Sequence, residues 1–338
     1  MRYNDLAKTD LKISLVGQGS GQFGSYDWGY NVNYSANDIK AIVKTSMEHG
    51  INFFDTAESY GDGLSESLIG VSLKNYNRDE YILITKVAPW NLTYNKMIKS
   101  VDRSLKRLGV DYIDIYLIHY PNPFISLRET MKTLEYLRKK GKIRYIGVSN
   151  FSKILMQKSQ EYLSSSEIIV NEVEFNLFSK RMYENVKSYC SKNNISIIAY
   201  SPLSGGLLSG KYDINNLPKD KARAFNFTNR ESFLNKNKEL IRTITRIAKE
   251  KNCTISQLAL SYIVSNSNCY AIPTALTVDE VIINSEATNF LLTRNELSTL
   301  NCLSKNVDLF TYFFDHFFIR PISWSKEAMR NTFFSTQN

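Results

Sequence analysis

Four polar side chains stand at or just beyond the ends of apolar runs of strand-like composition. Asp55, Lys86 and His119 end or directly follow three successive runs, and Tyr60 comes in the loop after Asp55. The carboxyl ends of neighbouring barrel strands meet on one face, so these side chains would converge there. One such residue alone would be unremarkable, but titratable groups after three consecutive strands predict a catalytic site.

The residue types suit proton transfer beside a hydride acceptor. A carbonyl reduced by hydride develops negative charge on its oxygen and needs a proton, which the Tyr60 phenol could supply although an unperturbed phenol has a pKa of about 10. A Lys86 ammonium about 4 Å away attracts a phenolate by on the order of 4 kcal/mol at an effective dielectric near 20. We therefore expect Lys86 to lower the pKa of Tyr60, by up to roughly 3.

The other two candidates support this pair. Asp55 would keep Lys86 charged and oriented, because an unpaired buried ammonium tends to lose its proton. His119 would hydrogen-bond the substrate oxygen or relay a proton.

The elements that must position these residues alternate along the chain. Short runs rich in Ile, Val, Tyr and Phe alternate with helical periodicities, which predicts a parallel sheet. Eight units in about 290 residues favour one closed (β/α)₈ TIM barrel of the α/β class over two open sheets. The strand candidates are 13–17, 51–54, 81–85, 112–118, 143–148, 168–173, 195–200 and 269–272.

We treat residues 1–338 as one domain. The barrel is expected over about 13–303, after a short N-terminal hairpin that ends near residue 15. An aromatic-rich C-terminal extension, 304–338, is expected to pack against the barrel. A long polar loop, 204–228, follows the seventh strand, and loops of this length are usually functional.

Composition excludes several classes of protein. The 338 residues are 43% hydrophobic and 22% charged, as in globular proteins. The net charge is +9, but the basic residues do not cluster, so no nucleic-acid partner is expected. No apolar run approaches the ~20 residues that cross a bilayer, and the charged segment 1–16 is not a signal peptide, so we expect no membrane partner. The four cysteines form no CxxC or zinc spacing, which predicts reduced thiols, a cytoplasmic protein and no metal site.

The segment Gly19–Gly24 matches GxGxxG after a strand. A dinucleotide-binding fold also needs a helix that starts at once and an acidic residue about 20 positions on. Here residues 25–33 are polar and aromatic, and helical periodicity starts only near Asn37. We therefore expect a flexible glycine loop that lines a pocket.

The chain resembles the aldo-keto reductase superfamily, in particular prokaryotic aldo/keto reductases, over about residues 3–303. The motifs that carry the resemblance are GINFFDTAESYG at 50–61, Lys86 in LITK, LIHYP at 117–121 and GVSNF at 147–151. The resemblance implies a catalytic tetrad of Asp55, Tyr60, Lys86 and His119, with Tyr60 as general acid, and hydride exchange between a nicotinamide cofactor and an aldehyde, ketone or sugar.

The resemblance also implies cofactor contacts at the nicotinamide and pyrophosphate. Ser149 and Asn150 would hydrogen-bond the carboxamide, and Tyr200 would stack on the nicotinamide ring. Glu172 stands where the family usually has Gln; it can still accept from the carboxamide but adds a negative charge. A glycine-containing loop would close over the pyrophosphate, with contacts from Ser201, Leu203, Ser204, Gly206 and Lys211.

The adenosine end departs further from the family pattern. Thr274, Leu276 and Thr277 lie where the family usually carries Lys or Arg for the 2′-phosphate, and Glu280 replaces a common Gln or His. Asn284 keeps the usual adenine contact. Because a buried phosphate needs a cationic partner, NADP(H) is the family default but NAD(H) is plausible here.

The partner is expected to be a small carbonyl or alcohol substrate. Trp28, Trp90 and Tyr120 follow strand ends and are candidate walls of its pocket, and 304–338 could also shape substrate choice. No exposed apolar stripe is separable from the core, so the sequence sets no oligomeric state.

Two other functions remain open. One is a cofactor-sensing regulatory subunit, like the potassium-channel β-subunits that share the implied fold. The other is an NAD-dependent sugar dehydrogenase that works oxidatively, suggested by the missing basic residues. If NADPH is nevertheless preferred, Lys219, Lys221 and Arg223 in the long loop are the candidate phosphate contacts.

Overall fold

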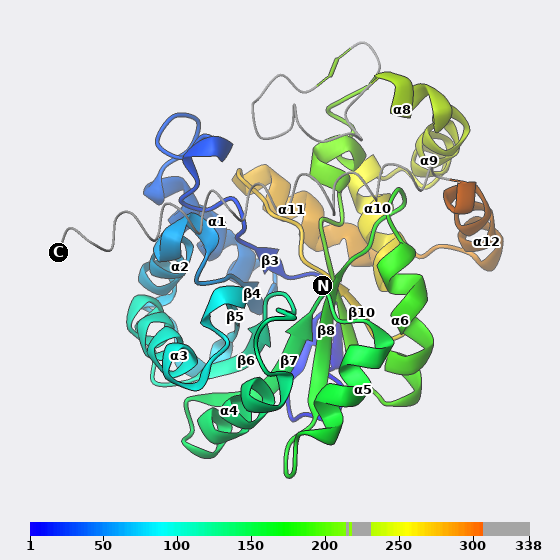
Figure 1. The fold of residues 1–338 in the computed structure, drawn as a ribbon. Helices are drawn as coiled ribbons and strands as arrows, with labels where there is room; N and C mark the ends of the chain where they lie inside the picture. Colours follow the sequence, from blue (N-terminus) through cyan, green and yellow to red (C-terminus); the bar gives the residue numbers. More distant parts are fainter. Residues whose placement is uncertain (214–215, 218–230, 307–338) are drawn as a thin grey trace.

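The computed structural model describes residues 1–213, 216–217 and 231–306. Eight parallel strands form one sheet in the order β10-β9-β8-β7-β6-β5-β4-β3, so neighbours in sequence are neighbours in space. Helices surround this sheet (Figure 1). The strands are β3 (Gln18–Gly19), β4 (Phe53–Asp55), β5 (Ile82–Val87), β6 (Ile113–Ile118), β7 (Ile143–Ser149), β8 (Ile168–Glu174), β9 (Ser196–Tyr200) and β10 (Cys269–Ala271).

The sheet closes between the last strand and the segment before the first. Val16 forms a parallel bridge with Ala271. Gly17 N donates to Ala271 O at 2.9 Å, and Gly19 N donates to Pro273 O at 3.0 Å. The predicted (β/α)₈ barrel is therefore confirmed.

The first barrel strand was predicted in the wrong place. Residues 13 and 14 belong to β2 (Lys12–Ser14), which pairs antiparallel with β1 (Tyr3–Asp5) in the expected N-terminal hairpin, and the barrel strand is β3. The prediction took the run 13–17 as a strand of the sheet. Instead, Leu11 and Ile13 pack with Phe53 in the cluster that fills the barrel interior. The hairpin thus covers the amino ends of the strands.

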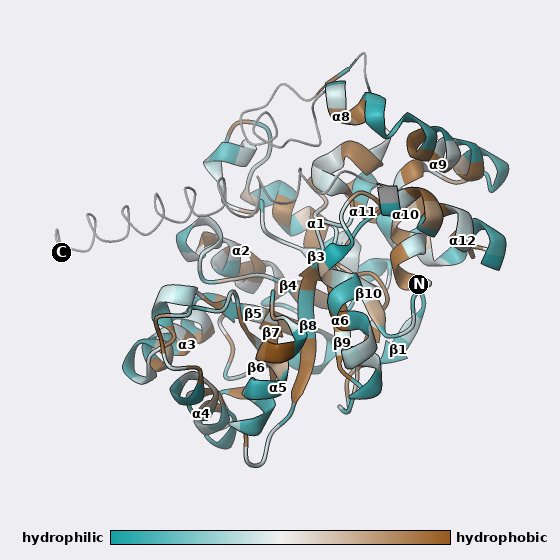
Figure 2. Ribbon diagram, turned by 45° about the vertical axis from the view of Figure 1, so that its right-hand side comes forward, coloured by the Kyte–Doolittle hydropathy of each residue, from teal (hydrophilic) through white to brown (hydrophobic). Residues whose placement is uncertain are grey.

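The other seven predicted strands overlap β4 to β10, and the helices follow their expected periodicity. Along the helices of Figure 2, brown and teal residues alternate, as expected when one face packs on the sheet. The helices are α1 (Ala36–Glu48), α2 (Leu64–Leu73), α3 (Tyr94–Leu108), α4 (Leu127–Lys139), α5 (Lys153–Glu161), α6 (Arg181–Lys192), α8 (Glu231–Lys236), α9 (Lys238–Glu250), α10 (Ile255–Val264), α11 (Val278–Glu286) and α12 (Arg294–Leu303).

Short 3₁₀ segments follow strands or helices. After strands come η1 (Tyr26–Trp28), η2 (Tyr60–Gly63), η4 (Pro89–Asn91) and η5 (Ser204–Ser209). After helices come η3 (Arg78–Glu80), η7 (Ala287–Asn289) and η8 (Ser304–Asn306). Two sequence expectations fall outside the described residues: the aromatic extension beyond Asn306, and the loop cations Lys219, Lys221 and Arg223. Within the described part of the chain, none of the helices has the length and apolarity that a membrane span requires.

Barrel closure generates a prediction about Gly17. A Cβ atom at this position would lie 2.3 Å from the Phe53 ring, and Phe53 is fully buried. We expect Gly17→Ala to lower the free energy of unfolding by about 1–3 kcal/mol, the usual cost of overpacking, in urea denaturation.

Gly21→Ala is the matched control, because a Cβ there meets nothing closer than 3.8 Å. Equal stability of the two variants would contradict the tight closure at Gly17.

Candidate active site

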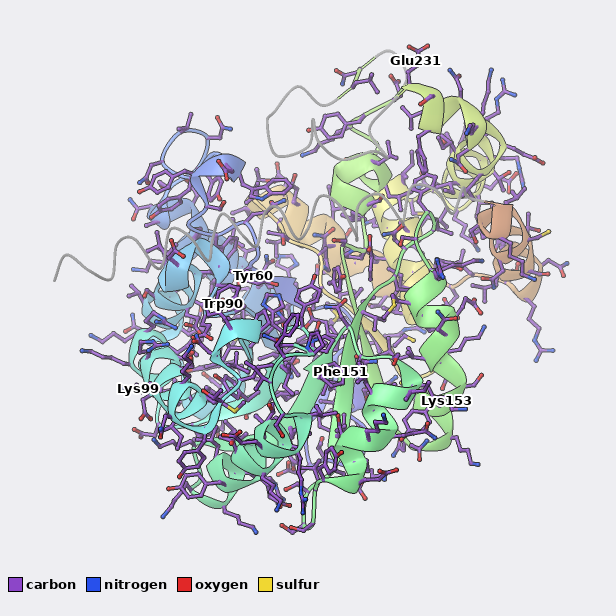
Figure 3. All side chains as sticks on the ribbon, viewed as in Figure 1. Tyr60, Trp90, Lys99, Phe151, Lys153 and Glu231 are labelled. Atoms are coloured by element: carbon purple, nitrogen blue, oxygen red, sulfur yellow. The ribbon has the colours of Figure 1, made fainter. Side chains whose placement is uncertain are left out.

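The carboxyl ends of three neighbouring strands bring the candidate residues together. Asp55 ends β4, Lys86 lies in β5 and His119 directly follows β6, while Tyr60 begins η2. In Figure 3 Tyr60 lies inside the ring of helices, whereas Lys99 and Glu231 lie at its rim.

Lys86 is the centre of this group and is fully buried. Its Nζ donates to Asp55 Oδ1 at 2.5 Å, to Thr56 O at 3.0 Å and to Tyr60 Oη at 3.4 Å. Proximity of Asp55, Lys86 and Tyr60 was expected from the sequence. The three bonds use all three ammonium protons, so the lysine holds the carboxylate and the phenol in one fixed arrangement.

A second carboxyl group faces the same ammonium. Glu172 Oε2 lies 3.4 Å from Lys86 Nζ, and Glu172 is 2% exposed. The sequence placed Glu172 only beside the nicotinamide. Strand alternation could have predicted its inward position. Val170 packs in the barrel interior, and Glu172 lies two residues further along the same strand, on the same face.

Electrostatics decide which groups are charged. Burial alone would lower the pKa of Lys86, but Asp55 and then Glu172 raise it above its ordinary value, so Lys86 is an ammonium. Burial raises the pKa of both carboxyl groups, and that of Glu172 well above its ordinary value.

The expected lowering of the pKa of Tyr60 is wrong. Burial raises this pKa above its ordinary value; Lys86 opposes the rise, while Asp55 and Glu172 add to it. The expectation counted only the ammonium and omitted desolvation and the two carboxyl groups. Tyr60 is therefore a protonated phenol at neutral pH, which suits a proton donor.

His119 lies beside Tyr60. The two rings are 5.4 Å apart between centroids and nearly perpendicular, at 83°. His119 Nδ1 lies 3.3 Å from Ser59 Oγ, and on its other side Tyr120 stacks at 5.1 Å. These neighbours fix the imidazole next to the phenol.

The three residues expected around the nicotinamide form one hydrogen-bonded unit. Tyr200 Oη donates to Asn150 Oδ1 at 3.0 Å. Asn150 Nδ2 donates to Ser149 Oγ at 2.9 Å and to His119 O at 3.2 Å. Asn150 has a φ of 63°, a left-handed conformation that asparagine tolerates better than most residues.

A cavity of about 530 Å³ is lined in part by Asp55, Tyr60 and Tyr200. Of the predicted site residues, those that line it are Trp28, Asp55, Tyr60, Tyr200, Ser201, Leu203, Gly206, Lys211, Thr274, Leu276, Thr277, Glu280 and Asn284. Those that do not are Lys86, Trp90, His119, Tyr120, Ser149, Asn150, Glu172 and Ser204.

The glycine loop also lines the cavity, as expected, through residues 19–22. The next α-helix, α1, begins only at Ala36, so the GxGxxG segment is not a strand-to-helix phosphate turn. A Cβ at Gly19 would lie 2.7 Å from Ile272 O. Glycine at this position thus allows β3 to approach the chain after β10.

The cavity lining contains an ion pair that the sequence did not predict. Lys211, after η5, pairs with Glu280 in the first turn of α11. Glu280 Oε2 also accepts from Leu276 N at 2.7 Å, and Thr277 caps the helix by accepting from Glu280 N at 3.2 Å. Lys211 is the one Lys or Arg among the described residues that line the cavity.

Comparisons with known proteins agree with this architecture. A model of the "Aldo/keto reductase family" matches residues 16–305. The chain is 33% identical over 290 residues to the uncharacterized oxidoreductase Rv2298 of Mycobacterium tuberculosis, which covers 86% of this chain and 88% of that protein. It is 28% identical over 304 residues to a probable voltage-gated potassium channel subunit beta of Arabidopsis thaliana, covering 83% of this chain and 89% of that one.

Solved structures show the same similarity. The thermostable aldo-keto reductase Tm1743, solved with the inhibitor epalrestat, has a TM-score of 0.75 and 30% identity, over 90% of this chain and 100% of that one. An aldo/keto reductase from Klebsiella pneumoniae, solved with NADP and acetate, has a TM-score of 0.70 and 26% identity, over 87% of this chain and 92% of that one.

The buried charge cluster predicts how Lys86→Met behaves. The variant leaves two buried carboxyl groups without a cation, so we expect a loss of about 3–5 kcal/mol in unfolding free energy. Both carboxyl groups would then need to be protonated in the folded state, so the loss should be larger at pH 8 than at pH 5. Urea denaturation at both pH values measures it.

Lys99→Met, an exposed lysine to methionine change on α3, is the control. The charge cluster would be contradicted if Lys86→Met lost no more unfolding free energy than Lys99→Met. It would also be contradicted if the loss were the same at pH 5 and pH 8.

Proposed function

The chain belongs to the aldo/keto reductase family, and from this premise we propose that it reduces the carbonyl group of a small aldehyde, ketone or sugar with a nicotinamide dinucleotide. The observation that carries the proposal is the buried Lys86 ammonium, which holds Tyr60 Oη at 3.4 Å at the wall of the cavity. We also propose that the chain forms one domain.

The cavity lining fits a dinucleotide. Glycines 205 and 206 have φ values of 64° and 100°, so the backbone of η5 can approach phosphate oxygens closely. We propose that Ser149, Asn150 and Tyr200 hold the nicotinamide and that the η5 loop holds the pyrophosphate. When bound, the reduced nicotinamide supplies the hydride.

The chain's own residues then supply the proton and the charge stabilisation. Tyr60 donates its proton to the substrate oxygen as negative charge develops there. The Lys86 ammonium stabilises the resulting phenolate, and Asp55 keeps Lys86 in position. His119, next to Tyr60, hydrogen-bonds the same oxygen. Trp28, which lines the cavity, forms a substrate wall, whereas the other two candidates, Trp90 and Tyr120, do not line it.

The protonation state of Tyr60 supports the reductive direction. Oxidation of an alcohol needs a phenolate to accept the proton, and the pKa of Tyr60 is raised, not lowered. The direction of this pKa shift favours reduction over the sugar dehydrogenase that the missing basic residues suggested.

The adenosine end supports use of NAD(H) as well as NADP(H). Lys211 is already paired with Glu280, and Thr274, Leu276 and Thr277 bring no charge to the cavity wall. A 2′-phosphate there would meet a carboxylate and a neutralised lysine, whereas a ribose hydroxyl could donate to Glu280. We therefore propose that the family's NADP(H) preference is lost in this chain.

A second candidate is a regulatory subunit that binds the cofactor without turnover. Similarity to the plant potassium channel subunit supports it. An assay of a panel of small aldehydes decides between the two, because binding without turnover favours the subunit.

The proposed proton donor leads to a prediction for Tyr60→Phe. The ring remains but the proton does not, so we expect kcat for carbonyl reduction to fall by about 10²–10⁴ while the dissociation constant of the cofactor stays within a few-fold. Steady-state kinetics and cofactor fluorescence measure these two quantities.

Tyr26→Phe makes the same chemical change at a side chain that is 71% exposed and should keep wild-type turnover. Full turnover by Tyr60→Phe would exclude Tyr60 as the donor.

The proposed cofactor choice leads to a prediction for Glu280→Arg. The wild type should bind NADH and NADPH within about tenfold of each other, and the variant should shift the ratio toward NADPH by at least about tenfold, or about 1.4 kcal/mol. Asp279→Arg is the control, since Asp279 is the exposed neighbour in the same helical turn.

A wild-type preference for NADPH of about a hundredfold, or about 2.7 kcal/mol, would contradict this assignment. Lys219, Lys221 and Arg223 would then be the next positions to replace.

A further inference from the structure

Two carboxyl groups share one ammonium in this site. Asp55 and Glu172 are each 2% exposed and Lys86 is fully buried. Both carboxyl groups lie within 3.4 Å of Lys86 Nζ. If both were ionised, the buried cluster would carry a net negative charge with no water to stabilise it.

Hydrogen-bond geometry shows where a proton is missing. The Lys86 ammonium donates its three protons to Asp55 Oδ1, Thr56 O and Tyr60 Oη. Among the described residues, two buried oxygens accept no hydrogen bond, Asp55 Oδ2 and Glu172 Oε2, although Glu172 Oε2 lies 3.4 Å from Lys86 Nζ. The two carboxyl groups meet at the same ammonium, at 2.5 and 3.4 Å from Lys86 Nζ, and each one shifts the pKa of the other. Two carboxyl oxygens that both lack a donor can satisfy each other only if one of them carries a proton.

We propose that Glu172 is a carboxylic acid at neutral pH and donates its proton to Asp55 Oδ2. Asp55 is then the ionised partner of Lys86, since it is the closer of the two, at 2.5 Å against 3.4 Å. This assignment gives both orphaned oxygens a partner and makes the cluster neutral. Glu172 acts as a positioning residue, because it holds the carboxylate that holds Lys86.

The surroundings of Glu172 contain no second cation in the part of the chain that the structure describes. Lys86 from β5, Asp55 from β4 and Tyr60 from η2 are the charged or titratable groups that face it. On β7 it pairs with Ser149, and on β9 with Ile198, neither of which is charged. Burial first, and then Asp55, raise the pKa of Glu172.

Glu66 is a second buried carboxyl group, and its hydrogen-bond partners differ from those of Glu172. It is also fully buried, but Thr85 Oγ1 donates to its Oε1 at 2.6 Å and Arg107 Nε donates to its Oε2 at 2.6 Å. Glu66 therefore has its own cation and a donor on each oxygen, whereas Glu172 has to share Lys86 with Asp55.

Ionisation of Glu172 would alter the reaction, a consequence that rests on the proposed function. A new negative charge beside Lys86 raises the pKa of Tyr60 further and opposes negative charge on the substrate oxygen. Turnover should therefore fall as pH rises through the pKa of Glu172, by about tenfold per pH unit. E172Q keeps a donor and an acceptor but cannot ionise, so this alkaline limb should be lost or move upward by at least one pH unit.

Infrared difference spectroscopy tests the proton without any assay of turnover. The wild type should show the C=O stretch of a buried carboxylic acid that shifts in D₂O. E172Q should lack it, and so should D55N, because without Asp55 the remaining carboxyl group ionises against Lys86. E161Q, on the exposed end of α5, is the matched control and should keep the band.

Stability gives a second readout of the same proton. The folded state keeps Glu172 protonated above the unfolded pKa of about 4.3, so the wild type loses stability as pH rises from there to the folded pKa. The melting temperature of E172Q relative to that of the wild type should thus increase with pH, and that of E161Q should not.

A wild type without the acid band, or a band that persists in E172Q or D55N, overturns the proposal. If E172Q does not fold, the comparison of wild type with D55N decides alone. A wild type that shows the band and the pH-dependent stability but no turnover supports the protonated Glu172 and overturns the proposed function.

Discussion

Burial of one ammonium group is the constraint on which the site depends. Lys86 is inaccessible to solvent and remains charged because carboxyl groups from β4 and β8 face it. Removing a charge from water is costly unless it is paired and hydrogen-bonded, so β4, β5 and β8 have to end at matching heights in the barrel. The phenol of Tyr60 then meets a cation in a fixed position, and its reactivity follows from that charge balance.

The barrel provides the two environments that this cluster needs. Below it, the interior is filled by apolar side chains, and the N-terminal hairpin adds Leu6 and Ile13 to them. Above it, the loops after the strands form a cavity whose lining includes the Lys211–Glu280 pair. The polar cluster lies at the boundary, where Tyr60 and Asp55 reach the cavity and Lys86 does not. The protein can thus present a proton at the cavity wall while excluding water from the cation that controls it.

The sequence predicted the parts of this arrangement that depend on local pattern. Strand periodicity placed Asp55, Lys86 and His119 at converging strand ends, and the irregular segment after Gly24 showed that the glycine motif was a pocket loop. The first strand was predicted at 13–17, and it was misplaced because Ile13 and Leu15 pack equally well in a hairpin that covers the barrel. The direction of the pKa shift at Tyr60, the position of Glu172 and the Lys211–Glu280 pair depend on desolvation and on contacts between distant segments. No local pattern encodes these.

The most direct test of this account is the titration of the Tyr60 phenol, followed by NMR of ring-labelled tyrosine and assigned by the signal missing in Tyr60→Phe. An ordinary tyrosine is half ionised at a pH of about 10. The account predicts that Tyr60 is still protonated there, because desolvation together with the Asp55 carboxylate outweighs Lys86. A phenol that ionises well below pH 10 would mean that the ammonium acts without its counter-charges, and the charge balance described here would be wrong.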